Sequence, residues 1–180
     1  MNHVTVSFVP EEKISMNVIL DKELYDHLWD KMLEEYQFRP RWNPDGNPFS
    51  FPHPYRLYRL GERCWTQEQE TRINEIFETL VPEDGFLYAL DWNHDCFIFN
   101  PRERIPLYYN YYDQERNVNV YFPSYHPDGD FHFFIAADWS FGMLGHPWRR
   151  ELYLWGDGLT AHFERLAQYL DLQEMAIPEQ

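Results

Sequence analysis

The stretch from His126 to Trp148, HPDGDFHFFIAADWSFGMLGHPW, constrains the fold more than any other part of this chain. It contains a turn sequence, an alternating aromatic segment, a second turn sequence and a Gly-His-Pro-Trp element without a break. Alternating apolar residues are typical of a β-strand, and Asp-Gly commonly joins two strands. The succession of turn and strand signals therefore predicts that this stretch forms part of a β-sheet. It matches no known catalytic motif.

Strand and helix signals alternate along the rest of the chain. Strands are expected at residues 4–8, 55–60, 107–112, 118–122, 131–137 and 151–155, with two more within 86–100. Three helices are expected. The first is capped by Asp21, the second opens at Thr66 with Gln69 in a capping box, and the third is capped by Asp157 and extends through Leu170. Each helix has an apolar stripe, so each is expected to pack on one side.

These elements predict an α+β fold in which about three helices cover one face of a mostly antiparallel sheet. No series of parallel strand–helix–strand units is visible. A length of 180 residues suits a single globular domain spanning residues 1–180. The glycine patterns of dinucleotide and P-loop sites are absent from the sequence, so nucleotide-dependent chemistry is not expected.

The charge of the chain bears on its partners. Thirty acidic side chains against 15 basic ones give a formal net charge of -15, which would repel nucleic acid and attract a basic protein. Solubility alone is the commoner reason for such a charge. No window approaches the roughly 20 apolar residues of a membrane span, and the N-terminal residues do not look like a secretion signal. We therefore expect a cytoplasmic protein with no membrane partner.

Two groups of histidines and aspartates suggest a metal site or a catalytic site. The first group has residue types that zinc, manganese or iron would accept: His126, Asp128, Asp130 and His132. Residues 127–129 form a turn signal that interrupts strand alternation, so we favour a turn here and predict no metal and no cofactor. His132 would then face the side opposite Phe131 and Phe133.

The second group would form a catalytic site if two turns met at one end of the sheet. Its members come from these turns: Asp91, His94, Asp95 and His146. A carboxylate can orient an imidazole and tune its pKa for proton transfer. No nucleophile is evident. The structural alternative, which we favour, is a rigid turn at residues 145–148 in which Trp148 fills a pocket and His146 bonds a backbone carbonyl.

A tyrosine-rich segment is the candidate binding surface. It comprises four tyrosines followed by two acidic residues: Tyr108, Tyr109, Tyr111, Tyr112, Asp113 and Glu115. Tyrosine offers a large contact area with a polar tip and is enriched at interfaces. An amphipathic strand with half-exposed rings is the alternative. Two adjacent tyrosine pairs cannot all point inward from one strand, so some of the rings should be exposed.

Four motifs, taken in order, resemble a known family. LDWNHD at residues 90–95, YHPDGD at 125–130, DWSFGMLGHPW at 138–148 and WG at 155–156 resemble the bacterial family named domain of unknown function 2716. The resemblance covers residues 86–163. It implies a shared fold, and because the family has no established activity it assigns no catalytic residue.

Three functions are compatible with these features. We expect a non-enzymatic acidic binding protein, such as an immunity protein that covers a basic toxin. The alternative is a small hydrolase-like enzyme, with or without a metal, whose catalytic residues would be Asp91, His94, Asp130 and His146. A housekeeping module with a small-molecule groove under the proline-rich segment 39–54 also remains open.

Overall fold

The structure, a computed structural model, describes residues 16–40 and 49–177. The strand expected at residues 4–8 lies outside them. The described helices are α1 (Lys22–Glu34), α2 (Gln67–Leu80), α3 (Asp157–Leu166) and a short 3-10 helix, η1 (Pro101–Glu103). The described strands are β1 (Asn17–Val18), β2 (Tyr55–Leu60), β3 (Leu87–Asp91), β4 (Phe97–Phe99), β5 (Asn110–Asp113), β6 (Val118–Tyr121), β7 (His132–Ala136), β8 (Gly142–His146), β9 (Glu151–Trp155) and β10 (Leu172–Met175).

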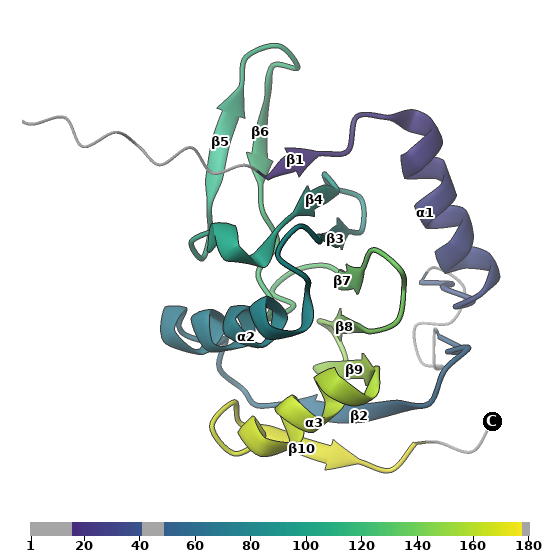
Figure 1. The fold of residues 1–180 in the computed structure, drawn as a ribbon, viewed down its shortest axis with the longest axis vertical. Coiled ribbons are helices and arrows are strands. Elements are labelled where there is room, and N and C mark those ends of the chain that lie inside the picture. The colour runs from purple at the N-terminus through teal and green to yellow at the C-terminus, as the bar shows by residue number, and fades with distance from the viewer. Residues whose placement is uncertain (1–15, 41–48, 178–180) are drawn as a thin grey trace, which may run out of the picture.

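Eight of these strands form one sheet in the order β1-β4-β3-β7-β8-β9-β2-β10. Every pairing in it is antiparallel. Strands β5 and β6 form a separate two-stranded hairpin that projects beyond the main sheet (Figure 1). The α+β class, the antiparallel sheet and the three helices are as predicted. None of the described helices has the length and apolar character needed to cross a membrane.

The helices cover both faces of the sheet, so the prediction of one covered face is wrong. On β7, Phe133 and Ile135 pack with α1, whereas Phe134 and Ala136 belong to the core beneath α2 and α3. Figure 1 shows α1 on one side of the sheet and α2 and α3 on the other. All five residues of β7, β8 and β9 are buried, and a central strand that is apolar on both faces needs a cover on each.

Two of the three predicted helix starts are confirmed. The Asp21 side chain accepts hydrogen bonds from the backbone of Glu23 and Leu24, and Thr66 and Gln69 form the reciprocal capping box. The start at Asp157 is wrong because Asp157 is already the first helical residue. Gly156 precedes it with φ of 88° and no side-chain cap, and a Cβ there would lie 2.4 Å from that of Phe141.

Three described strands of the sheet were not predicted from the sequence: the two-residue β1, β8 and β10. Strand β8 contains two glycines, which argue against a strand in the sequence alone. Each glycine makes room for a large neighbour, since a Cβ at Gly142 would lie 2.2 Å from Trp155 and one at Gly145 would lie 2.6 Å from Pro127. Strand β10 follows α3, which ends four residues before Leu170, and pairs with the outer side of β2.

The close contact at Gly142 predicts a stability defect. In Gly142→Ala the added methyl group must displace the buried Trp155 ring, and we expect the free energy of unfolding to fall by about 1–3 kcal/mol. The matched control is Gly129→Ala, because a Cβ built there has no heavy atom within 4 Å apart from those of the adjacent residues in the chain. Denaturant unfolding of both variants checks this, and equal stabilities would contradict it.

Candidate functional site

A cleft of about 520 Å³ lies where the turn between β3 and β4, the β5–β6 hairpin and the loop before β7 meet. Carboxylates and imidazoles line one side, and residues of the hairpin line the other. The lining residues are Asp91, Asn93, His94, Asp95, Arg116, Val118, Asn119, Tyr121, Asp128, Gly129, Asp130 and His132. The cleft therefore combines residues from both of the groups singled out in the sequence.

Three of the four predicted catalytic residues come together in this cleft. Asp91 ends β3, and the turn that follows brings the Nδ1 atom of His94 within 3.0 Å of an Asp91 carboxylate oxygen. Asp130 approaches from the loop before β7. One ligand atom from each of the three residues lies within 4.8 Å of the other two. The hairpin predicted around Asn93 and His94 is present as β3 and β4, and its turn brings the side chains of Asp91 and His94 into contact.

His132 lies beneath this group and is only 4% exposed. It pairs with Asp91 across β3 and β7, so both side chains point to the α2 side of the sheet, opposite Phe133 as predicted. The Nδ1 atom of His132 lies 2.8 Å from the carbonyl oxygen of Ser124. A carbonyl only accepts, so Nδ1 carries the proton, and in the neutral ring Nε2 keeps a lone pair. That Nε2 lies 3.9 Å from oxygens of both Asp91 and Asp128.

The electrostatics of Asp91 and His94 are coupled. Burial raises the pKa of Asp91, although the charge of His132 and the hydrogen bond with His94 oppose the rise. Desolvation alone would lower the pKa of His94, but the hydrogen bond and the charge of Asp91 outweigh it and raise this pKa. The two groups therefore form a carboxylate–imidazole pair that can hold a proton between them.

His146 does not join this group, so the structure does not bring the four predicted catalytic residues together. It faces the α1 side of the sheet, where its ring lies 4.6 Å from that of Phe131 and its cross-strand neighbour is the buried Glu151. Burial, together with the charge of Arg149, lowers the pKa of His146 to about 4. Its Nδ1 accepts the backbone N–H of Arg149 rather than donating to a carbonyl. Trp148 is 67% exposed, so the expected pocket-filling role is also wrong.

Asp95, which lines the cleft, and Asp113, on the hairpin, share one cationic partner. Arg116 bridges Asp95 and Asp113, with nitrogen–oxygen distances of 2.6 Å and 2.7 Å. The bridge ties the end of the β5–β6 hairpin to the turn between β3 and β4, so it positions the two walls of the cleft relative to each other.

The predicted tyrosine segment is divided between the core and the surface. Tyr108 and Tyr112 are 60% and 52% exposed, whereas Tyr109 and Tyr111 are half-buried. The acidic residues differ as well, since Asp113 is engaged by Arg116 and Glu115 is exposed. The sequence argument missed Tyr121 on β6, which is 59% exposed and also lines the cleft.

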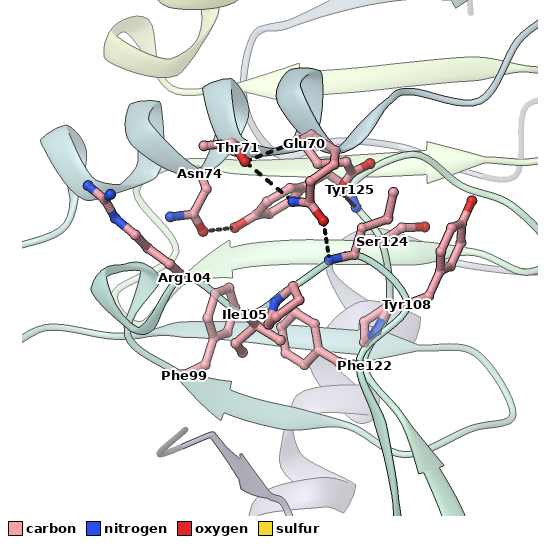
Figure 2. Close-up of a pocket in the computed structure, with 14 residues that line it drawn as sticks. Glu70, Thr71, Asn74, Phe99, Arg104, Ile105, Tyr108, Phe122, Ser124 and Tyr125 are labelled. Carbon is pink, nitrogen blue, oxygen red and sulfur yellow. Dashed lines mark hydrogen bonds between the residues drawn. The ribbon is translucent and has the colours of Figure 1, made fainter. Parts of the chain in front are cut away.

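A second, much smaller cavity of about 40 Å³ reveals what holds the loop before β7 (Figure 2). Glu70 and Asn74 on α2 point at this loop. The Glu70 carboxylate accepts the backbone N–H groups of Tyr125 and His126, both at 2.8 Å. The Tyr125 hydroxyl donates to the Asn74 side-chain oxygen at 2.7 Å (Figure 2).

This support was not predicted, although the sequence carries a signal for it. Glu70 and Asn74 fall on the same stripe of α2 as the buried Ile73 and Phe77. A carboxylate and an amide at helical spacing within an apolar stripe indicate buried polar groups, and these need partners elsewhere in the fold.

Comparison with known proteins agrees with the resemblance seen in the sequence. The model of the family described as "Protein of unknown function (DUF2716)" matches residues 19–160. The chain belongs to this family. The match begins well before residue 86, so it includes α1 and β2 as well as the motifs quoted above.

One curated relative supports the assignment to DUF2716. The protein named "Uncharacterized protein YxiI" of Bacillus subtilis (strain 168) is 28% identical over 145 residues, which cover 72% of this chain and 83% of that protein. No solved structure matches the chain at a significant level.

The buried position of Glu70 predicts a pH-dependent stability. Burial raises its pKa to about 7, so unfolding releases a proton between about pH 5 and 7 and stability falls as the pH rises. In Glu70→Gln this contribution is lost, because the amide does not titrate. Relative to the variant, the wild type should lose up to about 1.4 kcal/mol per pH unit in this range.

Denaturant unfolding at pH 5, 6 and 7 measures the difference. The matched control is Glu68→Gln, an exposed residue on the same helix, which should keep the wild-type pH profile. A wild-type profile in Glu70→Gln would show that this carboxyl group has an ordinary pKa.

Proposed function

We propose that this chain is a non-enzymatic, cytoplasmic binding protein that covers a basic protein partner with its β5–β6 hairpin. The observation that carries the proposal is the tyrosine surface, defined as Tyr108, Tyr112 and Tyr121, three rings that are each more than half exposed. Tyr112 and Tyr121 lie on the hairpin, and Tyr108 lies two residues before it. Exposed tyrosines are typical of a protein contact surface, since each ring adds area with little loss of conformational entropy.

The hairpin is anchored well enough to present these rings. Val120 is fully buried, and Tyr111 packs against the same core cluster beneath α2. Residues alternate between the two faces of a strand, so burial of Val120 turns Tyr121 outward. The bridges from Arg116 fix the far end of the hairpin to the main sheet.

The charge beside the tyrosine surface favours a basic partner. The exposed Glu115 lies on the hairpin, and Asp128 and Asp130 line the cleft next to Tyr121. The net charge of -15 adds a long-range attraction that speeds association with a cationic protein. Neutralising a basic toxin, as an immunity protein does, is the specific role that fits such a surface. Occlusion of the partner's active site would then be the mechanism.

The second function supported by an observation is hydrolysis. Asp91 and His94 form a carboxylate–imidazole pair at 3.0 Å inside a cleft, which suits a general base that activates water. This version of the enzyme hypothesis uses Asp91, His94 and Asp130 without His146. We rank it second because the exposed aromatic rings have no role in it.

The binding proposal predicts that tyrosine truncation removes partner capture. Tagged wild-type protein should retain a basic protein from lysate of its own source at low salt, and the capture should fall steeply with added salt. Tyr112→Ala combined with Tyr121→Ala should abolish it, because tyrosines at the centre of an interface often contribute most of the binding energy.

Tyr169→Ala is the matched control. This tyrosine is 43% exposed but follows α3, away from the hairpin, so the variant should capture the partner like the wild type. Retention of neutral or acidic proteins only, or equal capture by the double variant, would argue against the proposal. Addition of the captured protein to cells with and without this chain then tests the immunity role.

A further inference from the structure

We infer that Asp91, His94 and Asp130 form a binding site for one transition-metal dication of the zinc class. The site goes beyond the proposed binding function, which does not depend on it. The sequence argued against a metal held by His126, Asp128, Asp130 and His132, but it left a metal open in the alternative enzyme built on Asp91, His94, Asp130 and His146. Residues 128–130 form a bend in the loop before β7, and this loop brings Asp130 close to Asp91 and His94.

The geometry of the three residues is close to that of a metal site. Their ligand atoms lie within 4.8 Å of one another. Zinc bonds to nitrogen and oxygen are about 2.0–2.2 Å long, so donor atoms on one ion lie about 3–4 Å apart. His94 is exposed at a turn, so its side chain has room to reorient toward an ion.

His132 provides an independent indication of a ligand. It is buried, and its Nδ1 proton is committed to the Ser124 carbonyl, which leaves the lone pair of Nε2 facing the cleft. This Nε2 is 3.9 Å from Asp91 and from Asp128, too far for a hydrogen bond to either. A histidine that donates one ring N–H to a backbone carbonyl while the other nitrogen faces carboxylates has the arrangement of a metal-binding imidazole.

The negative charge of the carboxylates that line the cleft also favours a bound cation. Among the described residues, no lysine or arginine forms an ion pair with Asp91, Asp128 or Asp130. Arg116, the one arginine lining the cleft, is already bound to Asp95 and Asp113. The ion-pair partners of Asp91 among the described residues are two imidazoles, His94 at 3.0 Å and His132 at 3.9 Å, which are charged only when protonated. A dication would neutralise this buried carboxylate with both rings neutral.

The donor set selects the class of metal. Imidazole nitrogen suits zinc, iron, nickel and copper, whereas magnesium and calcium prefer sites made wholly of oxygen. Two carboxylates with one imidazole, and a second imidazole beneath them, therefore favour Zn²⁺ over Mg²⁺ or Ca²⁺. The open side of the cleft leaves room for water or a small anion on the ion.

Isothermal titration of the metal-stripped full chain with Zn²⁺, and separately with Mg²⁺, tests the inference. We expect one Zn²⁺ per chain and no comparable binding of Mg²⁺. His94→Ala, which changes an exposed turn residue, and Asp91→Asn should each weaken Zn²⁺ binding by about tenfold or more. Asp84→Asn is the matched control, since this exposed aspartate lies beyond the opposite end of β3 and should leave the affinity unchanged.

Thermal unfolding without metal shows whether each variant is folded, so that a loss of binding is not confused with a loss of structure. No Zn²⁺ binding by the folded wild type would overturn the inference. So would wild-type affinity in both folded variants, because the ion would then lie elsewhere. Capture of a basic partner by the tyrosine surface is expected with or without Zn²⁺, which keeps the two proposals separable.

Discussion

The burial of strand β7 on both faces is the constraint on which the rest of the structure depends. Phe133 and Ile135 need a cover on one side, and Phe134 and Ala136 need one on the other. Helix α1 provides the first cover, and α2 and α3 provide the second. Strands β3 and β8 pair with the two edges of β7, so this strand, buried along its whole length, lies at the centre of the sheet. A fold with helices on one face alone would leave half of these side chains in water.

A chain of polar contacts connects this core to the cleft. The buried carboxylate of Glu70 holds the backbone of Tyr125 and His126, and the carbonyl of the neighbouring Ser124 orients the imidazole of His132. His132 in turn faces Asp91. Buried polar groups require partners, and Glu70 and the Nδ1 atom of His132 find theirs in the segment that also shapes the site. Helix α2 therefore positions the floor of the cleft without lining it.

The cleft and the tyrosine surface adjoin each other and share Tyr121. The hairpin is thus both a wall of the acidic cleft and the base of an exposed aromatic surface. The same bridges from Arg116 organise both features, because they fix the hairpin against the turn that carries His94. A partner that covers the tyrosines would also close the cleft. This arrangement is compatible with a metal ion that lies within the contact area.

By itself the sequence determined the local structure: the capping box at Thr66, the hairpin around Asn93, the class of fold and the exposure of some tyrosines. These follow from contacts within a few residues and from the period of a strand. The tertiary structure alone decided which residues meet. His132 lies opposite Gly145, so the next residue, His146, falls on the other face, away from Asp91. Alternation gives relative faces within one strand, but strand register and the order of the sheet depend on packing between segments far apart in the chain.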